Sequence, residues 1–181
     1  MIYFTSDLHL GHNAIIYMRE RPFRDIDEMN RKLIGNINSL ISDRDTLYIL
    51  GDIAHHLTIE EANALIAQIH GRKILLRGNH DKDYDPSLFV DIRDYLEIKD
   101  EGVRFDLMHY PLRSWHGMRH GAIQLHGHIH AGMDYNLANR EKGIYQYDVG
   151  VDANGYFPVP INAIHEFFKD VTLTVKKLQD V

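Results

Sequence analysis

A short loop near the middle of the chain offers three side chains that can take part in chemistry. Asn79, His80 and Asp81 follow Gly78, directly after the apolar run Lys73 to Leu76. A buried strand that ends at a glycine and then presents an amide, an imidazole and a carboxylate is typical of a functional loop. Such side chains can bind a metal ion or transfer a proton.

Similar side chains follow four other strand-like runs. Asp7 and His9 come after Ile2 to Thr5, Asp52 after Thr46 to Leu50, His109 after Val103 to Met108, and His128 and His130 after Ala122 to Leu125. In open α/β sheets, ligands bind in the crevice outside the carboxyl ends of the strands. Taken singly, each block has a plainer explanation, since Asp and Asn commonly stabilise turns. Taken together, they predict a two-metal hydrolytic site.

The residue types limit which ions such a site would hold. The chain has no cysteine, so the ligands must be nitrogen and oxygen atoms. Imidazole combined with carboxylate and amide oxygen suits Mn²⁺, Fe or Zn²⁺ better than Ca²⁺. Two cations roughly 3.5–4 Å apart need a carboxylate that touches both, and Asp52, alone on its loop, suits that role. Asp7 and His9 would face one ion together if their segment is extended, because residues i and i+2 then point to the same side.

Length and composition narrow the class of protein. The 181 residues are most simply one domain, spanning residues 1–181, and the formal net charge is −6. Lys and Arg are scattered, which argues against a protein that grips extended nucleic acid. The chain begins without a basic leader, and it contains no apolar run near the ~20 residues that span a bilayer. We therefore expect a soluble cytoplasmic protein without a membrane partner, either a monomer or a small homo-oligomer.

The first half of the chain alternates strands and helices. Apolar residues at helical spacing predict a helix over about residues 26 to 42, in which Gly35 is unfavourable by roughly 1 kcal/mol. Thr58 and Glu61 fit a capping box that opens a second helix, ending near Ile69. With the strands at Ile2–Thr5, Thr46–Leu50 and Lys73–Leu76, this order predicts a parallel α/β layer.

The second half is richer in strands. Tyr95 to Lys99 and Val103 to Met108 flank Asp100-Glu101-Gly102, which indicates a hairpin. Further strands are expected at Ala122–Leu125, Tyr145–Val151 and Val171–Leu178, with a helix from Pro160 to about Lys169. The whole pattern predicts two sheets packed face to face with helices outside them.

The motif order Asp-x-His, Gly-Asp, Gly-Asn-His-Asp, His, Gly-His-x-His resembles the calcineurin-like metallophosphoesterase superfamily, specifically its small bacterial and phage single-domain members. The resemblance covers essentially the whole chain and implies an α/β fold, a four-layer α/β/β/α sandwich of two mixed sheets. It further implies two divalent metal ions with Asp52 as the bridging ligand. The ligands implied for one ion are Asp7, His9, Asp52 and His130, and those for the other are Asp52, Asn79, His109 and His128.

The resemblance also implies a reaction. A water bridging both ions would lose its proton near neutral pH, because even one Zn²⁺ lowers the pKa of bound water to about 7. The resulting hydroxide would attack phosphorus in line. His80 would then protonate the leaving oxygen, with Asp81 orienting it. A small phosphate ester, a phosphodiester or a nucleotide, is the expected substrate. The alternatives are a phosphomonoesterase with the same site and a metal-retaining scaffold without turnover.

Several residues near these motifs have two interpretations. His12 would contact substrate phosphate or support the metal ligands. In the 110–120 loop, Arg113 is the best candidate for a phosphate contact, unless the loop folds back with Trp115 against the core. His55 and His56 would line the cleft or face solvent, and His126 would support the ligands or pack in the core.

Overall fold

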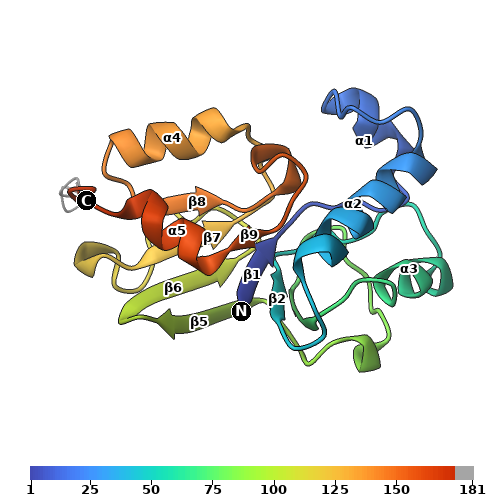
Figure 1. The fold of residues 1–181 in the computed structure, drawn as a ribbon, viewed down its shortest axis with the longest axis horizontal. Coiled ribbons are helices and arrows are strands. Elements are labelled where there is room, and N and C mark those ends of the chain that lie inside the picture. The colour runs from blue at the N-terminus through green and yellow to red at the C-terminus, as the bar shows by residue number, and fades with distance from the viewer. Residues whose placement is uncertain (174–181) are drawn as a thin grey trace.

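The computed structural model describes residues 1–173, which form two sheets with helices on their outer sides (Figure 1). The first sheet has the strand order β4-β3-β2-β1-β9. Its strands are β1 (Ile2–Thr5), β2 (Thr46–Ile49), β3 (Arg72–Leu76), β4 (Asp91–Arg93) and β9 (Val159–Pro160). The first four are parallel, with Ile2 of β1 opposite Thr46 of β2, and β9 runs antiparallel to β1. The carboxyl ends of β1, β2 and β3 therefore lie at one edge.

The second sheet has the order β5-β6-β7-β8. Its strands are β5 (Tyr95–Asp100), β6 (Val103–Met108), β7 (Ile123–His126) and β8 (Gln146–Asp148). The predicted hairpin is confirmed as the antiparallel pair β5 and β6, while β6, β7 and β8 are parallel. Both sheets are thus mixed, as predicted.

The side chains of the first sheet point alternately to its two faces and so contribute to two separate apolar clusters. Tyr3 and Leu47 belong to the cluster that packs under α1 (Asn13–Met18), α2 (Ile26–Leu40) and α3 (Ile59–Ile66). Phe4 and Tyr48, each one position later, belong to the cluster shared with the second sheet and α5 (Ile161–Phe168). In Figure 1, α2 and α3 lie to the right of β1 and β2, while α4 (Met133–Glu141) and α5 lie over the left-hand part. Successive side chains on a strand point to opposite faces, which explains this division.

The helix signals in the first half are confirmed by the hydrogen bonds. The Asp25 side chain caps α2 by accepting from the backbone N–H of Glu28, and Thr58 and Glu61 form the predicted capping box of α3. Helix α3 ends at Ile66, three residues earlier than expected, and His70 lies beyond it in a connection.

The second half differs from the prediction in several elements. The strand expected at Tyr145–Val151 is shorter in the structure, where β8 covers Gln146–Asp148 and a 3-10 turn begins at Val151. Helices α1 and α4 and the short strands β4 and β9 have no strong periodicity and were not predicted. The strand expected at Val171–Leu178 lies outside the described residues except for its first three positions, which have no regular structure. Within residues 1–173, every helix is too short or too polar to cross a bilayer.

Candidate metal centre

The loops that follow β1, β2, β6 and β7 are joined by backbone hydrogen bonds. Asp7 N–H donates to Gly51 C=O and His9 N–H donates to Asp52 C=O, both at 3.0 Å. Gly127 N–H donates to His109 C=O at 2.9 Å. This pairing brings side chains that are distant in the sequence into one buried cluster.

The first group of side chains consists of Asp7, His9 and His130. The Nε2 atoms of His9 and His130 lie 3.1 Å apart. Asp7 Oδ1 is 3.6 Å from His130 Nε2 and 4.0 Å from His9 Nε2. Three potential ligand atoms therefore converge on one small volume.

The second group lies around His109. Its Nε2 is 3.1 Å from Asn79 Oδ1, and its Nδ1 lies 2.7 Å from the Leu50 carbonyl oxygen. That carbonyl can only accept, so Nδ1 carries the proton and Nε2 presents its lone pair to the cluster. The His128 ring stacks edge-on beside His109, with ring centroids 5.0 Å apart.

Asp52 joins the two groups. Its Oδ2 atom lies 3.6 Å from His9 Nε2 and 3.6 Å from His109 Nε2. Its other oxygen, Oδ1, accepts from the backbone N–H of His80 at 2.9 Å. A single carboxylate oxygen thus stands equally far from both histidine-bearing groups, as a ligand shared by two ions requires.

Some buried polar atoms of the cluster have no hydrogen-bond partner, which is consistent with a site that binds cations. Asp7 Oδ1 and His9 Nδ1 are buried without a hydrogen-bond partner among the described residues. Burial, reinforced by the Asp148 carboxylate, raises the pKa of Asp7 well above its usual value. Within residues 1–173, the basic side chains within salt-bridge distance of Asp7 and Asp52 are histidines, which carry a charge only when they are protonated. Positive ions would compensate these carboxylates and accept the lone pairs that face one another.

The backbone is strained at the same positions. Ten non-glycine residues of the described chain have positive φ, and five of them are predicted ligands: Asp7, His9, Asp52, His128 and His130. Such conformations are unfavourable by about 1–3 kcal/mol each and concentrate at functional sites. Asp7 and His9 do face one another, but through left-handed backbone and not through the extended segment that was expected.

Two glycines allow the loops to approach this closely. A Cβ atom on Gly78 would lie 2.2 Å from Asp52 Oδ1. A Cβ atom on Gly127 would lie 2.0 Å from Ser6 Oγ and 2.2 Å from Asp7 Oδ2. Real Cβ atoms do not approach so near, so a larger residue at either place would displace a predicted ligand or its neighbour.

Gly127→Ala should therefore destabilise the protein by about 1–3 kcal/mol, the usual range for overpacking a buried site. Gly35→Ala is the matched control, because nothing lies within 4 Å of a Cβ there and the position is an exposed helix interior. The control should be stabilised by about 0.5–1 kcal/mol. Urea unfolding of both variants measures the difference, and equal shifts in the same direction would contradict the close approach at Gly127.

A buried ion pair positions His130. The Nδ1 atom of His130 lies 2.8 Å from Asp152 Oδ2, and Arg21 donates to both oxygens of Asp152 at 2.8 Å. Burial opposes ionisation of Asp152, but the hydrogen bonds from His130 and Arg21 outweigh it and lower its pKa to about 2. The Nδ1 proton of His130 is thus directed at Asp152, which leaves Nε2 free to bind a metal ion.

Arg21 and Asp152 were not predicted from the sequence. Arg21 also donates to the backbone carbonyls of Asp7 and Leu8. Asp152 directly follows the strand expected at Tyr145–Val151, so the rule that placed ligands after strands could have found it. In the structure it lies in a 3-10 turn (Val151–Ala153) that comes after β8. Arg21 stands in a loop with no pattern that separates it from a surface cation.

Arg21→Met should lower the free energy of unfolding by about 3–5 kcal/mol, since it leaves the buried Asp152 carboxylate without its cation. Arg24→Met is the control, because Arg24 pairs with Glu28 on the surface and its side chain is 79% exposed. The control should leave the urea midpoint almost unchanged. A comparable loss in both variants would show that the Arg21 pair contributes no more than a surface contact.

Comparisons with known proteins identify the family of the chain. The sequence model of the calcineurin-like phosphoesterase family matches residues 1–170. The chain belongs to this family.

The chain is similar over most of its length to several known proteins. It is 35% identical over 167 residues to an uncharacterised protein of Methanocaldococcus jannaschii, covering 90% of this chain and 88% of the relative. The gene 66 protein of Mycobacterium phage L5 is 29% identical over 184 residues, covering 84% of this chain and 87% of the phage protein. A crystal structure of an Aquifex aeolicus protein of unknown function is similar with a TM-score of 0.74 and 29% identity, covering 92% and 98% of the two chains.

In this member of the calcineurin-like phosphoesterase family, His80 lies beside the predicted metal ligands, and Asp81 differs from the expectation that it orients His80. The His80 and His9 ring centroids are 5.5 Å apart. The Asp81 carboxylate accepts from the backbone N–H groups of Asp52 and Ile53 at 2.9 Å and of Gly78 at 2.8 Å. The Tyr84 hydroxyl donates to it at 3.1 Å. Asp81 therefore holds the two ligand loops together, because its oxygens face backbone amides and not an imidazole.

The remaining candidates lie around the cluster or apart from it. Arg113 is exposed and lines a separate hollow of about 1290 Å³, formed with Arg104 and Lys142, whose described lining contains none of the predicted ligands. Trp115 donates its Nε1–H to the Ala122 carbonyl, but it belongs to neither apolar cluster and lines the same hollow, so packing of Trp115 against the core is not confirmed. His126 is buried, with Nδ1 2.9 Å from the Gly127 carbonyl oxygen, so it supports the ligand loop.

Proposed function

We propose that this calcineurin-like phosphoesterase hydrolyses small phosphate esters with the help of two divalent metal ions. The observation that supports this most is the position of Asp52 Oδ2, at 3.6 Å from both His9 Nε2 and His109 Nε2. A carboxylate so placed suits two ions at the spacing that in-line phosphoryl chemistry uses, about 3.5–4 Å.

The two groups of side chains support the two ligand sets that the family resemblance implies. Asp7, His9, Asp52 and His130 hold one ion, and Asp52, Asn79, His109 and His128 hold the other. When bound, the ions would neutralise negative charge on the phosphoryl oxygens and lower the pKa of bound water toward 7. Mixed imidazole, carboxylate and amide ligation favours Mn²⁺, Fe or Zn²⁺.

His80 supplies the proton to the leaving oxygen. Its backbone N–H donates to Asp52 Oδ1, and its ring lies near those of His9 and His55, with ring centroids 5.5 and 4.1 Å away. No hydrogen bond fixes the ring within the described residues, which leaves it able to reach a substrate oxygen. Asp81 fixes the backbone on which His80 stands, so its effect on the proton transfer is indirect.

A phosphodiester or a nucleotide is the proposed substrate, with a phosphomonoester as the alternative that uses the same ligands. His12 lies close to the proposed acid and ligands, with its ring centroid 5.4 Å from that of His9. Arg113 remains a proposed phosphate contact for a substrate long enough to extend along the 110–120 loop. Its guanidinium suits phosphate because it offers several donors in a plane.

A direct assay separates these possibilities. The metal-free protein is reconstituted in turn with Mn²⁺, Fe²⁺ and Zn²⁺ and assayed with bis(4-nitrophenyl) phosphate and with 4-nitrophenyl phosphate. Faster turnover of the diester supports the phosphodiesterase, and faster turnover of the monoester supports the alternative. No turnover with any ion would overturn the enzyme proposal and favour a metal-retaining scaffold.

A further inference from the structure

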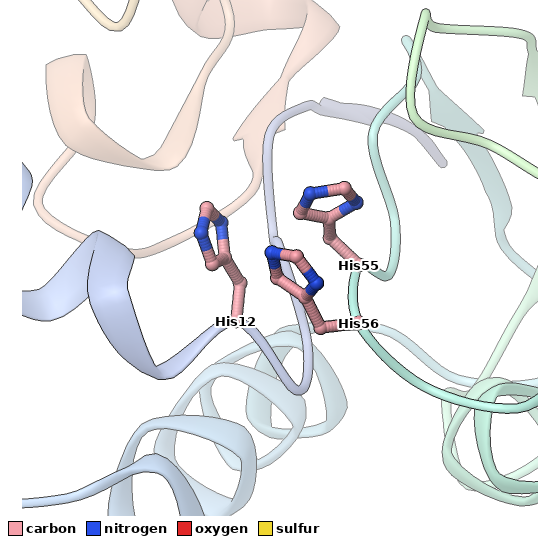
Figure 2. A group of neighbouring side chains, drawn as sticks. All are labelled: His12, His55 and His56. Atoms are coloured by element: carbon pink, nitrogen blue, oxygen red, sulfur yellow. The ribbon is translucent and has the colours of Figure 1, made fainter.

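Three histidines outside the proposed dinuclear site point their rings into one space. His12 comes from the segment before α1, and His55 and His56 come from the loop after β2 (Figure 2). One ring nitrogen from each lies within 4.8 Å of those from the other two. The ring centroids of His55 and His56 are 3.9 Å apart, and those of His12 are 4.8 and 4.9 Å from them.

The backbone holds the two contributing loops side by side. Leu10 and Ala54 form a parallel bridge, and His55 N–H donates to the Leu10 carbonyl at 2.9 Å. Gly11 has φ of 84°, and a Cβ there would lie 2.3 Å from the Leu57 side chain. Only glycine therefore lets the chain pass so close beneath the second loop before it presents His12.

The ring nitrogens have no other use among the described residues. His12 occupies the N-cap position of α1 but makes no capping hydrogen bond, and its Nδ1 atom is buried without a partner. Within residues 1–173, the hydrogen bonds of His12, His55 and His56 involve only their backbone atoms. A buried polar atom without a partner is unfavourable by about 1–3 kcal/mol, so a ligand is expected at His12 Nδ1. The half-buried His55 ring and the exposed His56 ring are near enough to bind the same ligand.

The geometry of the three rings favours a cation as that ligand. Their ring nitrogens lie within 4.8 Å of one another, so each imidazole can direct a lone pair at one ion. Imidazole is also the side chain that most commonly binds metal ions in proteins.

We propose that His12, His55 and His56 bind a third divalent transition-metal ion of the Zn²⁺ type. Three imidazoles without a carboxylate suit Zn²⁺ and exclude Mg²⁺ and Ca²⁺, which need oxygen ligands. Three protein ligands also leave a fourth tetrahedral position open. Nitrogens that share a tetrahedral Zn²⁺ lie about 3.4 Å apart. The exposed His56 ring can close the remaining gap by rotation.

This third site is separate from the dinuclear site but adjacent to it. It shares no ligand with the two proposed ion sites, and His55 lies next to His80, with ring centroids 4.1 Å apart. An ion bound there would place a positive charge close to His80, the proposed general acid. Its occupancy does not depend on the proposed reaction and can be measured without an activity assay.

The test counts bound zinc after dialysis against a metal buffer that fixes the free Zn²⁺ concentration. His56→Ala should bind one ion fewer per chain than the unmodified protein. His70→Ala, which removes an exposed histidine elsewhere, should bind the same number as the unmodified protein. Equal numbers in His56→Ala and the unmodified protein would overturn the proposal.

Two further measurements exclude misfolding, or loss of an ion from the dinuclear site, as the cause of a lower zinc count. His12→Gln should lose the same single ion, and far-UV circular dichroism should match that of the unmodified protein. In an Asp52→Asn background, His56→Ala should still remove one ion, which separates this site from a failure of the dinuclear one. A His12→Gln protein that is folded and retains every ion would also overturn the proposal.

Discussion

Asp52→Asn should reduce metal-dependent diester hydrolysis by about 10³-fold or more. A bound ion contributes several kcal/mol of transition-state stabilisation, and each 1.36 kcal/mol corresponds to tenfold in rate. Asparagine keeps the shape of the side chain and an oxygen for the His80 N–H, which Asp52 Oδ1 accepts at 2.9 Å. It removes the negative charge that both ions share. The measurement is kcat/KM for bis(4-nitrophenyl) phosphate at saturating Mn²⁺, together with the number of Mn²⁺ ions bound.

Asp83→Asn is the matched control for this variant. Asp83 is an exposed aspartate on the loop that follows His80, and its loss removes the same charge from the protein as a whole. The control should keep both its turnover and its ions. An Asp52→Asn protein that retained normal turnover and both ions would show that residue 52 is not the shared ligand.

His80→Ala should slow the hydrolysis of esters with poor leaving groups much more than that of esters with good leaving groups. A general acid is worth about 10²- to 10⁴-fold where the leaving oxygen needs a proton, and little where the oxygen leaves as a stable anion. Hydrolysis of an alkyl or nucleoside diester should fall by that factor, while a nitrophenyl diester should be nearly unaffected. The ratio of kcat values for the two esters measures the role of His80.

His120→Ala serves as the control for a lost histidine, because His120 is exposed and lies on the 110–120 loop. That variant should leave the ratio unchanged. Equal losses on both esters in His80→Ala would remove His80 from the role of acid. They would point instead to damage at the adjacent ligand Asn79.

The ends of the strands were predictable because their signals are local. Each of β1, β2, β3, β6 and β7 is a short strand-like run, continuous apolar or alternating, followed by a polar ligand-type residue, and the structure confirms all five as strands. The parallel pairing then places Asp7, Asp52 and Asn79 at one edge by topology alone. The capping box of α3 was also readable, since Thr58 and Glu61 act within a single turn.

The features that the sequence did not predict depend on contacts between segments that are distant in the chain. Arg21 and Asp152 are 131 positions apart, and neither has a neighbour in the sequence that reveals the other. The left-handed backbone at Asp7 and His9 is imposed by hydrogen bonds to the loop of Asp52, so spacing along the strand does not predict it. Asp81 likewise binds amides of two loops, which a Gly-Asn-His-Asp motif cannot indicate.

Anomalous diffraction from crystals of the Mn²⁺-loaded protein tests the central claim most directly. We predict two manganese peaks about 3.5–4 Å apart, with the Asp52 carboxylate bound to both and His9 and His109 on opposite sides. A single peak, or two peaks that do not share Asp52, would contradict the account.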